Sequence, residues 1–212
     1  MADISRIRMP PKGRGCLYPG SIYNGTQKSG RLSYEVTVEI LNIDLNNSHL
    51  EGYLNIRGLT EDWPELTTFF TAEIIGKDHG FVTGRWGATE ADDMKHWNRF
   101  GPFKTLHRSL PEDKMRFNHL NKPFVFMRWK ERFLVPDWRV RDISGASFAG
   151  FYYVCAWLGD PSEWIGGSAT PVSTTMDSGR ISAFYYHENS EPYQQLDLRH
   201  VEKRSSEAFE MR

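Results

Sequence analysis

Alternation of apolar and polar residues recurs along this chain and predicts β-strands. Segments 34–40 and 50–56 both alternate with a period of two, which is typical of a strand with one buried face. Residues 44–48 between them are turn formers, so the two strands are expected to form a hairpin. The positions expected to face the core are Tyr34, Val36, Val38, Ile40, Leu50, Leu54 and Ile56.

Further strands follow along the rest of the chain. They are expected at 67–75, 124–129, 151–157, 181–187 and 193–198. Many strands separated by turn signals, with few helices, indicate a β-sandwich or a β-barrel.

One stretch, residues 77–122, departs from the strand pattern and predicts a helical insertion. Thr89-Glu-Ala-Asp92 is similar to a capping box with acidic residues in the first turn. Gly101-Pro102 is expected to end or kink this helix, and a second short piece follows. Its apolar stripe most simply packs against the core. The stripe comprises Ala91, Met94, Trp97, Phe103 and Leu106.

Composition places this chain among globular proteins of one domain. Its 212 residues suit a single all-β domain, and a 14% aromatic content supplies large core side chains. We expect a flexible N-terminal arm at 1–15, a barrel domain at 16–212 and a long loop at 159–179. A net charge of −1 gives no general attraction to nucleic acid. No apolar run approaches the roughly 20 residues that span a bilayer, so no integral membrane association is expected.

The two cysteines, Cys16 and Cys155, are expected to be unpaired thiols. Cys155 lies in an apolar strand, where a free cysteine behaves as a small hydrophobic residue. A disulfide between the two is the alternative. Unpaired cysteines fit a reducing compartment, so we expect a protein of the cytoplasm or nucleus.

Catalytic and metal motifs are weak in this sequence. Ser147 lies in a G-x-S-x-x-G phrase that is one residue longer than a nucleophile elbow, so a structural turn is the simpler interpretation. Glu131 and Asp137 could in principle form a glycosidase-like pair, but no other part of such a site accompanies them. The histidines lack metal-ligand spacing, and His96 with Asp92 is an i, i+4 pair on a helix. We expect no cofactor and no metal.

Two aromatic phrases, 126–137 and 142–153, carry the strongest functional signal. Each contains a strand, and together they place the carboxylate of Glu131 near tyrosine hydroxyls around an apolar concavity. A carboxylate there is costly unless it is paired, and an ammonium group would pair it. The best ligand is therefore a small cation with an apolar body, such as the N-terminus of a peptide. By itself, Glu131 also fits an ordinary solvated charge at a strand end, which is the commoner case.

The chain resembles the substrate receptors of the GID (or CTLH) ubiquitin ligase, the vacuolar import and degradation family. The resemblance runs from about Cys16 to the C-terminus. It includes the segments 17–21, 52–60, 66–70, the two aromatic phrases, 185–187 and 193–194. It implies a single eight-stranded antiparallel up-and-down barrel, similar to a lipocalin barrel, with a helical insertion.

The resemblance also implies a non-catalytic receptor that binds the N-terminal peptide of proteins destined for degradation. The expected first residue is classically proline, with other small or apolar first residues as alternatives. Glu131 would accept the amine and Tyr152 would bond the first residue, near Ser147 and Tyr185. The peptide backbone would be held by Gln194 and Ser190, and Gln27, from an Asn24–Ser29 loop, would contact the peptide further along. The apolar walls would be Leu59, Leu66, Leu134 and Phe148.

The same resemblance implies two protein partners. A C-terminal anchor at about 205–212, with Phe209, Met211 and Arg212, would dock onto an armadillo-repeat scaffold subunit. The scaffold would connect the receptor to a RING-bearing core. The alternative function is a lipocalin-like carrier of small molecules, which an aromatic-lined barrel also permits; Glu131, Gln194 and Gln27 favour the receptor.

Overall fold

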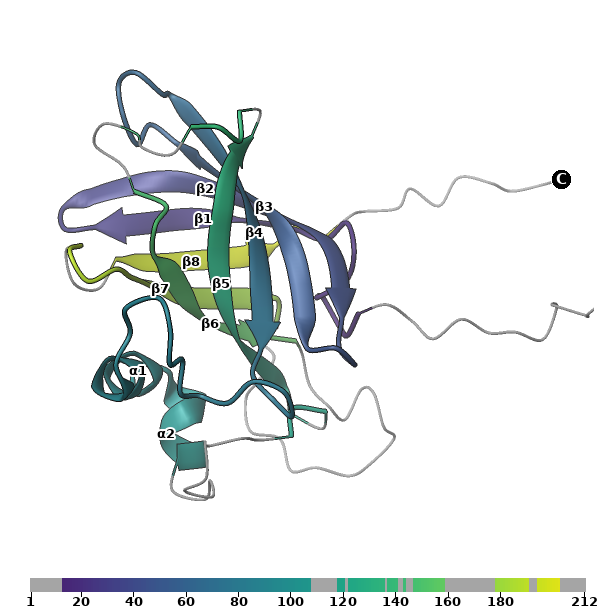
Figure 1. Cartoon of the computed structure of the whole chain (residues 1–212). Coiled ribbons are helices and arrows are strands. Elements are labelled where there is room, and N and C mark those ends of the chain that lie inside the picture. Colours follow the sequence, from purple (N-terminus) through teal and green to yellow (C-terminus); the bar gives the residue numbers. More distant parts are fainter. Residues whose placement is uncertain are drawn as a thin grey trace, which may run out of the picture.

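The computed structural model describes eight strands that close into one barrel. It describes residues 13–107, 118–120, 122–135, 137–140, 143, 147–158, 178–190 and 194–202. The strands are β1 (Ile22–Ser29), β2 (Leu32–Asp44), β3 (His49–Arg57), β4 (Glu65–Ile74), β5 (Phe124–Val135), β6 (Phe151–Trp157), β7 (Arg180–Tyr186) and β8 (Gln195–His200). Each pairs antiparallel with its neighbour in sequence, and β1 pairs with β8 to close the ring (Figure 1). The expected fold is confirmed.

The two strands predicted from the clearest alternation form the hairpin of β2 and β3. Val36, Val38 and Ile40 are buried in the barrel interior, and Tyr34 packs partly against it. Asp44 pairs with His49 across the turn, so the predicted hairpin is confirmed.

Strand β1 was not expected. The prediction of a loop at Asn24–Ser29 is wrong, because this segment pairs with β2 on one side and with β8 on the other. Its sequence carries little apolar signal because Gly25 and Gln27 share the face of Tyr23. The strand forms because both of its edges are hydrogen-bonded, which is a tertiary effect that local pattern does not report.

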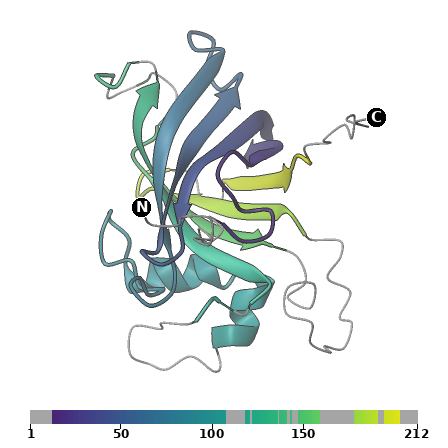
Figure 2. The ribbon, with the colours of Figure 1, turned by 90° about the vertical axis from the view of Figure 1, so that its right-hand side faces the viewer.

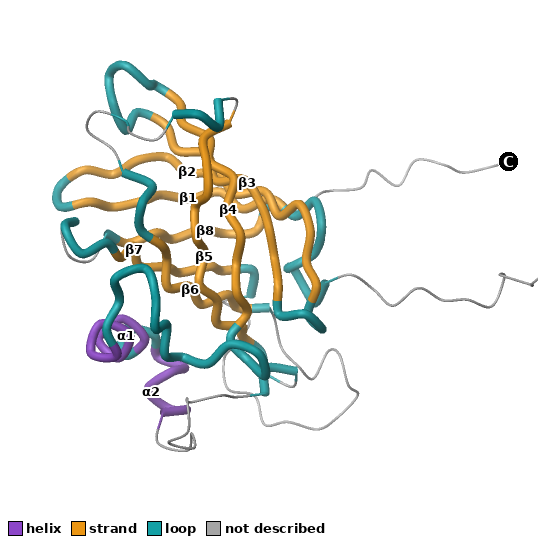
Figure 3. Tube along the Cα trace, viewed as in Figure 1, coloured by secondary structure: helices purple, strands orange, loops and turns teal. Residues whose placement is uncertain are grey.

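Two short helices, α1 (Glu90–Trp97) and α2 (Gly101–His107), lie against one side of the barrel, as Figure 2 and the colouring of Figure 3 show. The predicted capping box between Thr89 and Asp92 is present. The first helix ends at Trp97, and Gly101-Pro102 begins the second helix instead of ending the first. Proline is tolerated in a first helical turn because the N–H groups there have no helical partner.

The buried face of α1 differs from the predicted stripe. Asp93, His96 and Trp97 are buried, whereas Ala91 is exposed. Asp93 accepts hydrogen bonds from the hydroxyl of Tyr153 at 2.8 Å and from the backbone N–H of Thr83 at 2.6 Å. The buried side of α1 therefore makes polar contacts through Asp93 as well as apolar contacts through Trp97. His96 contacts the backbone oxygen of Asp92 through Nδ1 at 2.7 Å, and its ring stacks on Tyr153.

The barrel wall separates two apolar clusters. The inner cluster fills the interior of the barrel. It includes Phe70 and Trp129, whose rings stack with centroids 4.7 Å apart. The outer cluster lies between the helices and the outward faces of β5, β6 and β7. Its fully buried rings are Phe81, Trp97, Phe103, Phe126, Phe151 and Tyr153. This cluster packs the helical insertion against the strands that carry Glu131 and Tyr152.

Several expectations fall on residues that the structure does not describe. These are the N-terminal arm as far as residue 12, most of the 159–179 loop, residues 108–117 of the insertion and the C-terminal anchor with Phe209, Met211 and Arg212. Cys16 and Cys155 are free thiols, as expected. None of the described helices has the length and apolar character that crossing a bilayer requires.

Candidate functional site

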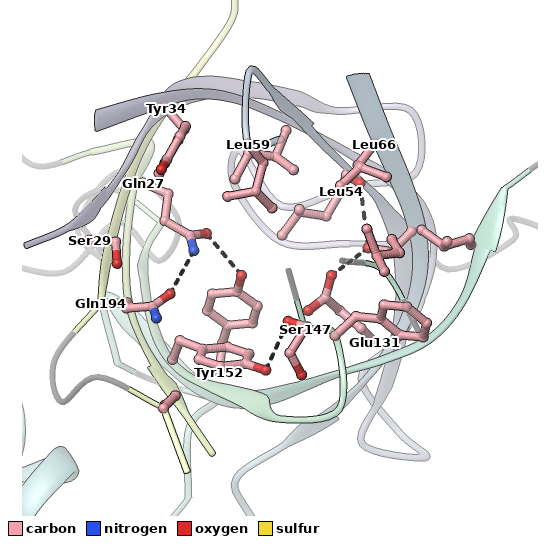
Figure 4. Close-up of a pocket in the computed structure, with 17 residues that line it drawn as sticks. Gln27, Ser29, Tyr34, Leu54, Leu59, Leu66, Glu131, Ser147, Tyr152 and Gln194 are labelled. Carbon is pink, nitrogen blue, oxygen red and sulfur yellow. Dashed lines mark hydrogen bonds between the residues drawn. The ribbon is translucent and has the colours of Figure 1, made fainter. Parts of the chain in front are cut away.

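A cavity of about 180 Å³ opens at one end of the barrel, where the loops β1–β2, β3–β4, β5–β6 and β7–β8 lie. All eleven residues named above for the peptide pocket line this one cavity (Figure 4). They come from eight different parts of the chain: β1, the β3–β4 loop, β4, β5, the segment before β6, β6, β7 and the segment before β8. The structure therefore brings the predicted set together, while its binding role stays a prediction.

Glu131 provides a buried carboxylate on the inner face of β5. The residue is only 6% exposed, and the hydroxyl of Thr68 on β4 donates a hydrogen bond to Oε1 at 2.7 Å. Burial raises the pKa of Glu131 to about 7, although Thr68 and the charge of Lys130 act in the opposite direction. The solvated strand-end interpretation of Glu131 is therefore wrong.

A β-bulge at Arg132 lets Glu131 and Leu134 share the cavity. Phe70 pairs with Glu131 and Phe69 pairs with Phe133, so Arg132 is the extra residue in β5. Regular alternation would put residues 131 and 134 on opposite faces of the strand. The bulge shifts the phase, so Leu134 points inward and Phe133 stacks on Phe69 outside the barrel with centroids 5.1 Å apart.

Tyr152, Gln27 and Gln194 form a hydrogen-bonded chain on the opposite side of the cavity. The hydroxyl of Tyr152 donates to Oε1 of Gln27 at 2.9 Å, and Nε2 of Gln27 donates to Oε1 of Gln194 at 3.2 Å (Figure 4). Gln27 is thus a buried member of the cavity wall and not part of an outer loop. Because the Tyr152 proton is directed to Gln27, the hydroxyl oxygen can accept a hydrogen bond from a ligand.

Tyr185 joins the wall to the segment before β6. Its ring lies edge-on to Tyr152 with centroids 5.1 Å apart, and its hydroxyl donates to the backbone oxygen of Ser147 at 3.1 Å. Burial raises the pKa of both tyrosines, and the charge of Glu131 raises each further. Both phenols therefore stay protonated at neutral pH. Ser190, whose hydroxyl bonds the backbone oxygen of His187, completes the polar side.

The geometry does not support the catalytic alternatives. Oγ of Ser147 accepts the N–H of Ala149 at 3.3 Å, which is a local turn bond. Asp137 is exposed and accepts the N–H of Arg139, so it is engaged in its own turn. Within the described ranges, no group of three or more His, Cys, Asp or Glu residues is arranged to hold a metal ion.

Sequence reasoning missed part of the cavity. Thr68, the donor to Glu131, lies at an inward position of β4 between Leu66 and Phe70. A threonine between two inward apolar residues at a spacing of two was the signal that could have identified it. The other missed lining residues are Ser29, Tyr34, Leu54, Ile56 and Ile143.

The chain is similar to a known protein family over most of its length. Residues 16–201 match the family model described as "Vacuolar import and degradation protein". The chain belongs to this family. The region of the match spans every strand of the barrel, so the predicted family resemblance is confirmed.

Three relatives of the vacuolar import and degradation family illustrate the similarity. The mouse "Glucose-induced degradation protein 4 homolog" is 44% identical over 206 residues, which is 97% of this chain and 87% of that protein. The Saccharomyces cerevisiae "GID complex substrate-recognition subunit 4" is 31% identical over 86% of this chain and 61% of that protein. The Schizosaccharomyces pombe protein of the same name is 33% identical over 88% of this chain and 91% of that protein.

Proposed function

We propose that this chain is the substrate-recognition subunit of a GID-type ubiquitin ligase, and that its cavity binds the free N-terminus of substrate proteins. The names of the fungal relatives support the first part. One observation carries the second part: a buried carboxylate, Glu131, faces a small cavity whose other wall offers the hydroxyl oxygen of Tyr152 as a neutral acceptor.

Two acceptors favour an N-terminal proline over other first residues. The proline ammonium is secondary and carries two N–H donors, one for Glu131 and one for Tyr152. A primary ammonium has a third donor, and leaving it without a partner in a buried site costs about 1–3 kcal/mol. The proline ring is apolar and rigid, so it suits the walls of Leu66 and Leu134 and loses little entropy on binding.

The size of the cavity supports a terminal residue over a free small molecule. Sites for drug-sized ligands usually occupy roughly 300–1,000 Å³. The volume here is about 180 Å³ because Phe70, Trp129 and their neighbours fill the barrel beneath it. A carrier of lipocalin type would need a deeper apolar cup, so this alternative is disfavoured.

In this account the protein presents the bound substrate to the rest of the ligase and performs no chemistry itself. A RING-bearing core would transfer ubiquitin, and an armadillo-repeat scaffold would hold the receptor through the C-terminal anchor. Phe209, Met211 and Arg212 remain the proposed anchor residues.

A first-position peptide scan tests the proposed function. Peptides that differ only in the first residue are titrated: proline, N-methylalanine, alanine and leucine. Proline should bind tightest, and N-methylalanine should exceed alanine because it shares the secondary ammonium. Equal affinity for all four peptides would contradict the proposed readout.

A further inference from the structure

Lys130 does not line the cavity, but it contacts a chain segment that forms part of the cavity wall. It precedes Glu131 on β5, and its partly buried side chain reaches to the chain segment before β6. There Nζ donates hydrogen bonds to the backbone oxygens of Ala149, at 2.5 Å, and Gly150, at 2.8 Å. Lysine ammonium groups usually extend into water, so two bonds to backbone carbonyls mark a specific attachment.

The attached segment, Ser147–Gly150, forms one wall of the cavity through Ser147 and Phe148. Its second attachment is Tyr185, which accepts the N–H of Gly150 at 2.9 Å and donates to the oxygen of Ser147. A side chain at Gly150 would collide with Tyr185 and with the backbone of Tyr186. The wall is therefore pressed closely against β7 and is tied to β5 by Lys130.

The charge of Lys130 also affects the carboxylate beside it. Its positive charge favours the ionised form of Glu131 and lowers the pKa of Glu131, against the larger effect of burial. Burial in turn lowers the pKa of Lys130, and the charge of Glu131 opposes that shift. One side chain thus influences both the shape of the wall and the charge of the pocket.

We propose that Lys130 is a positioning residue for N-terminus recognition, which holds the Ser147–Gly150 wall in its binding position. This inference rests on the proposed function, from which it takes the N-terminus of a peptide as the ligand. Lys130 itself does not touch the ligand; it acts through the wall and through its neighbour.

Three variants separate this role from a general effect of surface charge. Lys130→Met removes the ammonium but keeps much of the apolar stem, and Lys130→Arg keeps a charge that can bond both carbonyls. Lys28→Met removes a positive charge from an exposed position near the same end of the barrel and serves as the control. The peptide used is one that begins with proline.

Affinity and its pH profile give the first readout. Lys130→Met should weaken binding by about tenfold, as expected for a lost charged hydrogen bond, and should move the acidic limb of the pH profile upward. Lys130→Arg should keep the affinity and the pH profile close to those of the wild type. Lys28→Met should leave the affinity and the pH profile near wild type. An unchanged affinity and pH profile in Lys130→Met would overturn the inference.

Amide hydrogen exchange gives a second readout that needs no ligand. In Lys130→Met, the amides of Phe148 to Phe151 should exchange faster while those of β2 and β3 stay protected. If the wild type bound no peptide, the proposed function would fail, and exchange alone would decide the inference. Unchanged protection at these amides would then refute the positioning role.

Discussion

The hydroxyl of Tyr152 donates a hydrogen bond to Gln27 at 2.9 Å across the interior of the barrel. Tyr152 lies on β6 and Gln27 on β1, which are not neighbours in the sheet. Gln27 in turn donates to Gln194, so its amide holds a defined orientation between two partners. This relationship fixes the polarity of the site, because the tyrosine oxygen is left to accept from a ligand.

Removing the hydroxyl of Tyr152, the proposed acceptor, should weaken binding of a peptide that begins with proline. Tyr152→Phe should cost about 1.5–3 kcal/mol of binding free energy, the range for a hydrogen bond to a charged group. Gln27→Leu should cost less, because the hydroxyl remains but its direction is no longer fixed. Calorimetry on both variants and on the double variant checks this. Additive losses would contradict the relay, since residues that act through one another are non-additive.

Neutralising the carboxylate of Glu131 should weaken binding without lowering the stability of the fold. Glu131→Gln should reduce the binding free energy by about 2–5 kcal/mol because the ligand ammonium loses its charged partner. The same change removes a buried charge, so the free energy of unfolding at pH 8 should be equal to or above that of the wild type. Glu39→Gln, at an exposed position of β2, is the matched control. A normal affinity in Glu131→Gln would exclude the assigned role.

Binding should depend on pH through Glu131. The groups near it are Thr68 from β4, Tyr152 and Tyr185 from β6 and β7, and Lys130 on its own strand. Glu131, whose pKa is about 7, titrates near neutrality, whereas the pKa values of both tyrosines are raised above their ordinary value. The ligand needs the carboxylate, so affinity should fall as pH drops below 7, approaching about tenfold per unit.

The free energy of unfolding should depend on pH in the direction opposite to that of binding. The folded pKa of Glu131 lies above the unfolded value of about 4.5, so the folded state binds more protons between pH 4.5 and 7. The contribution of this group to the free energy of unfolding should therefore decrease as pH rises through that range. Comparing urea denaturation of wild type and Glu131→Gln at several pH values isolates it. A difference that does not vary with pH would show that Glu131 is not buried as described.

Two buried tryptophans should respond differently to the same substitution. Nε1 of Trp97 donates to the backbone oxygen of Phe81 at 2.8 Å, whereas Nε1 of Trp129 has no hydrogen-bond partner in the part of the chain that the structure describes. Trp97→Phe leaves a buried carbonyl without its donor, so it should cost about 1–3 kcal/mol more stability than Trp129→Phe. Urea midpoints with equal slopes measure this difference. Equal costs would contradict it.

Local pattern predicted the parts of this fold in which side chains report burial directly. The alternation in 34–40 identified β2, and Thr89 with Asp92 identified the start of α1. Local pattern did not predict strand β1, because Gly25 and Gln27 occupy inward positions. Pairing with β2 and β8 explains their extended conformation. The bulge at Arg132 was not predicted for a related reason, since no local residue preference marks it.

The candidate site depended on the family resemblance more than on local pattern. The resemblance supplied residues such as Gln27 and Leu59, which composition alone would not single out, and the structure gathers them around one cavity. The hydrogen bonds from Thr68 to Glu131 and from Tyr152 to Gln27 were absent from the sequence analysis because they join strands distant in the chain.

The central claim is that this cavity binds a free, charged N-terminus. Calorimetric titration with a short peptide that begins with proline, beside its N-acetylated twin, tests it most directly, because acetylation converts the charged amine into a neutral amide without N–H donors and leaves the rest of the peptide unchanged. The account predicts binding of the free peptide and none of the acetylated one. Equal binding of both peptides would contradict the account and would remove Glu131 from the centre of recognition.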